Sequence, residues 1–88
     1  MKLFKIERGE KYSEETIFVA AKTNMQAVYI ASYITEPVTW IDGECTELTE
    51  REIEYSSSII NVAKWNQYKS AGYAGIVNMN NFIRKEQK

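Results

Sequence analysis

Residues 23–35 contain no charged residue, and this stretch constrains the fold more than any other part of the chain. Thr23 or Asn24 can cap the start of a helix, and Pro37 disfavours helical geometry at the residue before it. We therefore expect a helix over about residues 25–34. A helix on a protein surface normally carries charge on its outer side, so a helix without charge needs cover on more than one side.

Two neighbouring faces of this helix are apolar. The second face carries Met25, Tyr29 and Tyr33 at intervals of four residues. Two interpretations of it stay open. A second helix or the C-terminal segment covers this face, or it is an interface with a second copy or with another protein. The first face combines alanine and isoleucine at helical spacing and is expected in the core: Ala27, Ile30, Ala31 and Ile34.

Short β-branched and aromatic runs predict strands on both sides of the helix. We expect strands over residues 2–6, 16–20 and 38–41, and residues 44–47 form either a fourth strand or a loop. The first two strands are separated by a polar turn, so a β-hairpin is the simplest pairing. An 88-residue chain buries limited surface, which favours one domain with one core between two layers.

The second half of the chain predicts further helix. Thr49 and Glu52 match a capping box, which marks a helix start, and the serines at 56–58 weaken the pattern enough to break that helix. Gly72 or Gly75 is expected to end the helical region, before a final helix or strand. The whole pattern predicts an α+β domain over residues 1–88, in which a small antiparallel sheet of three or four strands packs against two or three helices.

Composition argues against catalysis. The chain has no histidine and a single cysteine, Cys45, which removes the usual general base and the commonest zinc ligand. We expect no catalytic residue, no metal site and no cofactor. A lone cysteine forms no intramolecular disulfide, and no apolar run reaches the length of a signal peptide or a membrane span. These features predict a cytoplasmic protein with no membrane partner.

Charge is unevenly distributed along the chain. Residues 36–54 contain seven acidic residues and one arginine, whereas residues 55–88 contain five basic residues and one acidic residue. Segregated charge indicates partners of opposite sign. No helix start explains Asp42, Glu44 and Glu47, and the one arginine is the only cation in their segment. We expect these three acids to project uncompensated from one edge of the sheet and to bind a partner with a basic surface.

The basic segment interleaves cations with aromatic side chains. This combination suits a small anionic ligand or nucleotide held by a homo-oligomer, or single-stranded nucleic acid, whose bases stack while its phosphates meet cations. The sequence pI of about 5.5 argues against nucleic acid. The residues of this alternative ligand site are Lys64, Trp65, Tyr68, Lys69, Tyr73 and Arg84.

The chain resembles small accessory proteins of bacteriophages and mobile elements. The resemblance rests on its size, on the expected hairpin followed by the helical sequence AAKTNMQAVYIA, and on abundant Lys, Glu, Ile, Asn and Tyr; it covers the plan of residues 1–45. Many such proteins bind and inhibit a host protein, including host defence proteins. The resemblance therefore implies an inhibitor or adaptor in the host cytoplasm, and it assigns no site residue.

We therefore expect a non-catalytic module that acts by stoichiometric binding to a protein. Three alternatives remain: a homo-oligomer that binds a small anionic ligand or nucleotide, a single-stranded nucleic-acid binder, and an enzyme that works through carboxylates and tyrosines.

Overall fold

A four-stranded antiparallel sheet forms the centre of the molecule, with strand order β3-β1-β2-β4. The structure is a computed structural model, and it describes residues 1–7, 16–33 and 44–80. The elements in chain order are β1 (Lys2–Glu7), β2 (Thr16–Ala21), α1 (Asn24–Ala31), β3 (Glu44–Glu47), α3 (Glu50–Tyr55), α4 (Val62–Ala71) and β4 (Gly75–Asn80). The small α+β fold expected from the sequence is confirmed.

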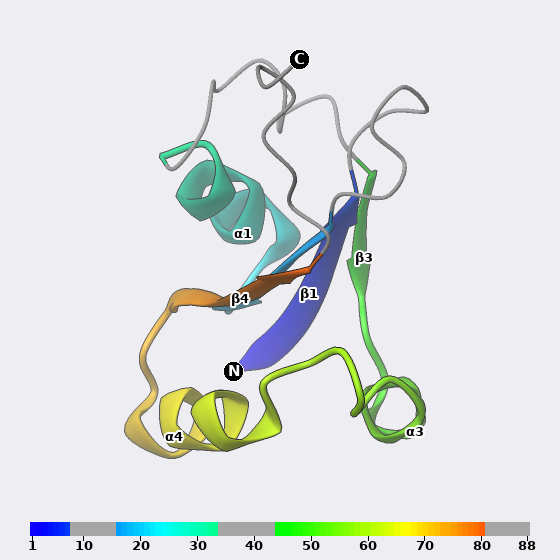
Figure 1. Cartoon of the computed structure of the whole chain (residues 1–88). Helices are drawn as coiled ribbons and strands as arrows, with labels where there is room; N and C mark the ends of the chain where they lie inside the picture. The colour runs from blue at the N-terminus through cyan, green and yellow to red at the C-terminus, as the bar shows by residue number, and fades with distance from the viewer. Residues whose placement is uncertain (8–15, 34–43, 81–88) are drawn as a thin grey trace, which may run out of the picture.

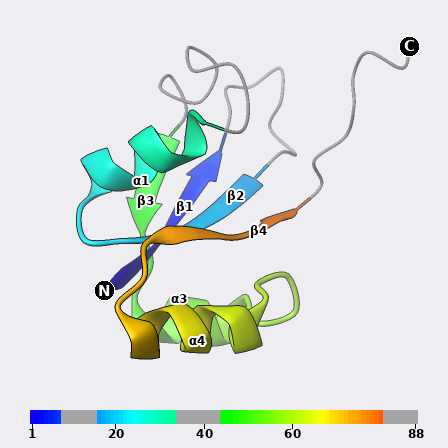
Figure 2. The same cartoon turned by 90° about the vertical axis from the view of Figure 1, so that its left-hand side faces the viewer.

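Helices cover both faces of this sheet. Helix α1 lies on one face, and α3 and α4 lie together on the other (Figures 1 and 2). Each face has its own cluster of buried side chains. The expectation of one core between two layers is therefore wrong. Strand β2 is buried along its whole length, so its two alternating sets of side chains supply both clusters at once.

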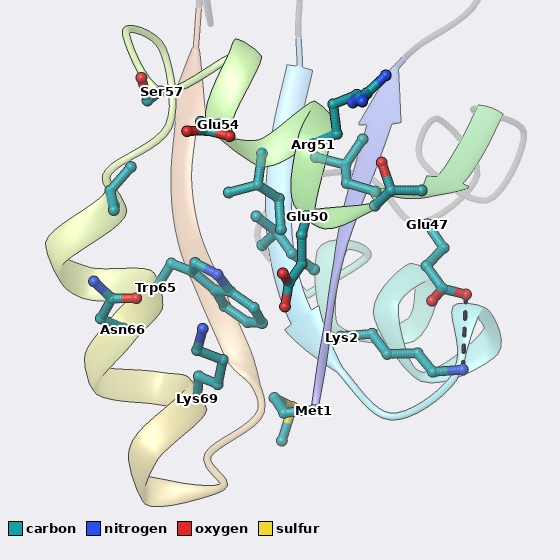
Figure 3. Close-up of a pocket in the computed structure, with 15 residues that line it drawn as sticks. Met1, Lys2, Glu47, Glu50, Arg51, Glu54, Ser57, Trp65, Asn66 and Lys69 are labelled. Carbon is teal, nitrogen blue, oxygen red and sulfur yellow. Dashed lines mark ion pairs between the residues drawn. The ribbon is translucent and has the colours of Figure 1, made fainter.

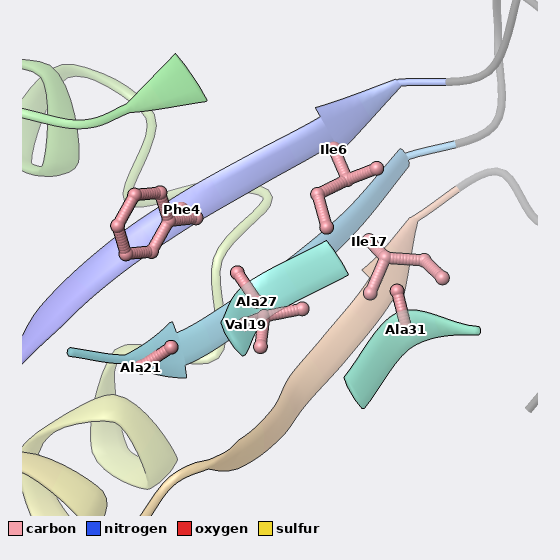
Figure 4. Close-up of a cluster of buried hydrophobic side chains, with 7 residues drawn as sticks. All are labelled: Phe4, Ile6, Ile17, Val19, Ala21, Ala27 and Ala31. Carbon is pink, nitrogen blue, oxygen red and sulfur yellow. The ribbon is translucent and has the colours of Figure 1, made fainter. Parts of the chain in front are cut away.

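On the α1 side of the sheet, the helix packs against the strands through small residues. Ala27 and Ala31 of α1 are fully buried against larger side chains of the sheet (Figure 4). Alanine allows a helix to approach a sheet closely, because no long side chain separates the two backbones. The buried residues of this cluster are Phe4, Ile6, Ile17, Val19, Ala21, Ala27 and Ala31.

The α3–α4 side is closed by large residues. Trp65 of α4 is 4% exposed and packs in a cluster with side chains from three strands and connecting segments. Strand β4 contributes through a bulge, because Phe18 lies opposite Asn78 while Val19 lies opposite Ile76. The buried residues of this cluster are Leu3, Phe18, Ala20, Leu48, Ile60, Trp65 and Val77.

Local signals in the sequence set several element ends. The predicted capping box is present: Glu52 N donates to Thr49 Oγ1 at 3.1 Å, and Thr49 N donates to Glu52 Oε1 at 2.8 Å. The helix breaks at the serines, as predicted, and α4 begins after the N-cap Asn61. Gly72 ends α4 with φ +68°, a left-handed conformation that favours glycine.

The structure changes the predicted end of the first helix, decides between strand and loop or helix in two segments, and leaves one predicted strand undescribed. The first helix ends at Ala31 rather than near residue 34, because its last turn tightens and Tyr33 N donates to Ile30 O. Residues 44–47 form a strand, which resolves the choice between strand and loop, and the final segment is the strand β4. The strand predicted over residues 38–41 lies outside the described residues.

Candidate functional site

Met25 and Tyr29 of α1, together with Tyr33 two residues after the helix ends, form an exposed apolar surface, called here the outer face of α1. These side chains are 79%, 62% and 72% exposed. The two tyrosine rings meet edge to face, with 5.2 Å between centroids. Met25, Val28 and Tyr29 also line an apolar hollow of about 360 Å³. The surface is therefore contiguous and has relief into which a partner side chain can insert.

No charge interrupts this outer face. The pKa of Tyr33 lies above the ordinary tyrosine value because of a side-chain hydrogen bond with Tyr29, so the Tyr33 hydroxyl group is neutral at physiological pH. Helices α3 and α4 lie on the opposite face of the sheet and do not cover it (Figure 2). The C-terminal segment, the other candidate cover, lies outside the described residues from position 81 onward.

The predicted acidic site is only partly described. Asp42 lies outside the described residues, and Glu44 begins β3, where its backbone pairs with Glu7. Glu47 ends the same strand at the edge of the sheet, but it is not uncompensated as expected: Lys2 Nζ lies 3.7 Å from Glu47 Oε1. The sequence places these two residues far apart, and the antiparallel pairing of β1 with β3 brings them together.

A groove of about 810 Å³ lies between α3 and α4 (Figure 3). Its floor is apolar and comes from Leu3, Leu48 and Trp65. Its two lips differ in charge. Glu50 and Glu54 project from α3, whereas Asn66 and Lys69 project from α4. The remaining lining residues are Met1, Lys2, Glu47, Thr49, Arg51, Ile53, Ser57 and Val62.

The predicted basic and aromatic site is a set of internal contacts rather than a row of free rings. Lys69 Nζ lies 5.3 Å from the ring centre of Trp65, and Lys64 Nζ lies 5.6 Å from that of Tyr68. Tyr68 in turn meets Tyr73 edge to face at 4.9 Å. Trp65 is buried and offers no stacking platform, and Tyr73 is the exposed ring of the set. Arg84 lies outside the described residues.

The reactive groups of the described part are few. Cys45 is half-buried, and burial raises the pKa of its thiol, so the thiol is protonated at neutral pH and is a weak nucleophile. Within residues 1–7, 16–33 and 44–80, no cluster of three His, Cys, Asp or Glu side chains is placed to hold a metal ion. What the described surface offers is shape and apolar contact.

Sequence reasoning missed the groove. Its floor depends on Leu48, whose N–H donates to Leu3 O at 2.9 Å, a contact that joins the end of β3 to the start of the chain. The one available signal was an isolated leucine between two acidic clusters.

The described helices include none with the length and apolar character needed to cross a bilayer. No protein-family model, curated protein or solved structure matches the chain.

Proposed function

We propose that this chain is a non-catalytic binding module that docks another protein on the outer face of α1, in a stoichiometric complex. One observation carries the proposal: Met25 and Tyr29 of α1 and Tyr33 just after it are exposed, while the inner face of the helix is already packed on the sheet. Contiguous apolar surface of this kind is typical of interaction sites, and Tyr and Met are enriched at them.

The chemistry of this face indicates the kind of partner. Because the face is neutral and apolar, its complement is a neutral apolar surface or a groove that accepts tyrosine rings. This differs from the basic partner that the acidic segment predicts, and the ion pair between Lys2 and Glu47 reduces the support for that segment as the main contact. The resemblance to phage accessory proteins makes a bacterial host protein the partner class to test, with inhibition as the outcome.

The test compares three versions of the purified chain as bait in a bacterial lysate. The wild type and Tyr73→Glu should capture the same protein in a near-equimolar amount, whereas the double variant Tyr29→Glu, Tyr33→Glu should not. Tyr73 is the matched control because it is 57% exposed, contacts Tyr68 of α4 on the other side of the sheet, and does not line the groove. The captured protein is then purified and titrated calorimetrically against each version to give a stoichiometry.

Two results would contradict the proposal. In the first, the double variant captures the partner as well as the wild type does, which would place the contact elsewhere. In the second, the substitutions lower the mass of the chain's own particle in sedimentation and leave capture unchanged, which would make the outer face of α1 a self-contact.

A further inference from the structure

We propose that the groove between α3 and α4 is the contact surface for a second copy of this chain, arranged about a two-fold axis that sets α3 of each copy against α4 of the other. The groove has a volume of about 810 Å³, and residues of both helices line it (Figure 3). The inference is independent of the partner site on α1, which lies on the opposite face of the sheet.

The charges of the two helices indicate that the groove binds a second copy of the chain. Helix α3 carries three glutamates and one arginine, a formal net charge of −2, and α4 carries Lys64 and Lys69 with no acid, a net charge of +2. A two-fold contact presents the same patch from both copies, so the patch must be complementary to itself. The charged helix residues that line the lips are Glu50, Arg51 and Glu54 on α3, with a net charge of −1, and Lys69 on α4, with a charge of +1. Lips of opposite charge satisfy this condition, because rotation brings each lip against its opposite.

No ion pair between described residues joins the acids of α3 to the lysines of α4, although Lys64 and Lys69 lie over the rings of Tyr68 and Trp65, and Glu52 is held in the capping box. The ion pairs between residues 1–7, 16–33 and 44–80 are those of Lys2 with Glu47 and of Lys5 with Glu7, and neither involves α4. Glu50 and Glu54 stand on one lip and Lys69 stands on the other, with the floor of the groove between them. Glu50, Glu54 and Lys69 therefore have no ion-pair partner among the described residues and can pair across a contact between copies.

Apolar surface around the groove would supply the attraction that charge alone lacks. Exposed ion pairs contribute little, so a stable contact needs buried apolar area as well. Ile53 and Val62 are half-buried at the lips and can lose their remaining exposure. Tyr55 and Ile59, which follow on from the acidic lip, are 90% and 41% exposed. A second copy seated here covers apolar surface and pairs charges at once.

Such a dimer would present two copies of the outer face of α1. Because α1 lies across the sheet from α3 and α4, a contact through the groove leaves both α1 faces accessible (Figures 1 and 2). A bivalent particle binds an oligomeric partner more tightly than a single copy does, without any new contact.

The experiment uses charge reversal and mixing. The acid-reversed variant carries Glu50→Lys and Glu54→Lys, and the base-reversed variant carries Lys64→Glu and Lys69→Glu. Sedimentation should show a dimer for the wild type and monomers for each variant alone, with the dissociation constant raised about tenfold or more by like-charge contact. An equimolar mixture of the two variants should dimerise again, because each contact then joins opposite charges. Lys22→Glu, the same change on the exposed start of the α1 layer, should leave the dimer intact.

Circular dichroism of each variant separates loss of association from loss of fold. If reversal unfolds α3, the milder pair Glu50→Gln and Glu54→Gln replaces it and should weaken the dimer by a smaller factor. A wild-type chain that stays monomeric at high concentration would overturn the proposal, and so would a mixture that associates no better than its components. A chain that proves monomeric should still capture a partner through α1, without the gain from bivalency, and a chain that captures no partner can still be tested for the dimer.

Discussion

The two helical layers distribute large and small side chains in opposite ways. On α4, Trp65 points into the core and closes its side of the sheet. On α1, the buried residues are Ala27 and Ala31, while the large side chains, among them Met25 and Tyr29, lie on the outside. Both helices begin at a side-chain cap and are similar in length, so the difference comes from which residues face the sheet.

This difference indicates what each layer contributes. Burying apolar area contributes about 25 cal/mol per Å², so a buried tryptophan stabilises the fold and an exposed tyrosine contributes little. Helix α4 is therefore held against the sheet mainly by the burial of Trp65. Helix α1 packs closely on the sheet through the small residues Ala27 and Ala31. Its large residues remain available for contact with another molecule. The comparison predicts opposite responses to mutation on the two helices.

The largest effect is expected on the α4 side. Trp65→Ala should lower the free energy of unfolding by about 3–5 kcal/mol, because it removes the largest buried side chain of that cluster and leaves a cavity. Urea denaturation followed by far-UV circular dichroism measures it. Asn66→Ala, the exposed next residue, is the control and should change stability by less than about 0.5 kcal/mol. A loss below about 1 kcal/mol for Trp65→Ala would show that α4 is not held by its tryptophan.

On the α1 side, adding bulk should be the damaging change. Ala27→Leu should cost about 1–3 kcal/mol, because Ala27 is fully buried against the sheet and a larger side chain must push the helix away. The same denaturation assay measures it. Ala63→Leu on the exposed side of α4 is the matched control and should be nearly neutral. Equal stability of Ala27→Leu and the wild type would mean that α1 does not sit closely on the sheet.

The sequence predicted local features of both helical layers, but it did not predict how the helices are arranged on the two faces of the sheet. The spacing of Ala27 and Ala31 predicted the inner face of α1, and the capping box at Thr49 predicted the start of α3. These features are local, and they depend on residues only a few positions apart. The three-layer arrangement was missed because it depends on which face of the sheet a helix crosses, and no local pattern encodes that choice.

The candidate sites show the same limit. Exposure of Met25 and Tyr29 follows from helical spacing, so the sequence could suggest this face. The pairing of Lys2 with Glu47 follows from β1 lying beside β3, which joins residues 45 positions apart in the chain. Basic neighbours put Trp65 in the alternative ligand site, whereas its burial depends on tertiary packing.

A smaller effect is expected where β4 holds the start of α4. The Asn78 side chain accepts from Asn61 N at 2.9 Å and donates to Ile59 O at 3.0 Å, so it bridges the strand and the loop before the helix. Asn78→Ala removes both bonds and should cost about 1 kcal/mol, because water can replace them at this exposed site. Asn78→Asp keeps the acceptor and should cost less. Denaturation midpoints of the two variants give the order. An equal loss would show that the bond from Asn61 N contributes nothing, and no loss in either variant would contradict a role for the bridge.

A pH effect should follow from the cap of α3. The pKa of Glu52 lies below the ordinary glutamate value, because the Thr49 backbone N–H and then the Thr49 side chain hydrogen-bond to its carboxylate. A lowered folded-state pKa gives stability that is present above the unfolded value of about 4.3 and is lost as pH falls through the folded value. Glu52→Gln should therefore be less stable than the wild type at pH 7, with the gap closing in acid. Urea midpoints from pH 7 to pH 3 test this; a gap independent of pH would contradict it.

The smallest effect is expected on the outer face of α1. Tyr29→Ala removes a side chain that is 62% exposed and that touches Tyr33 edge to face. Losing this aromatic contact is offset by the higher helix propensity of alanine, so stability should change by less than about 0.5 kcal/mol.

The value of this prediction lies in its contrast with Ala27→Leu, two residues earlier on the same helix. Adding bulk on the inner face should destabilise the chain, whereas removing bulk on the outer face should not. If Tyr29→Ala instead costs as much as a core truncation, about 3 kcal/mol, then the outer face of α1 is packed within the chain. The proposed docking surface would then be part of the core, and the reason for expecting a protein partner there would disappear.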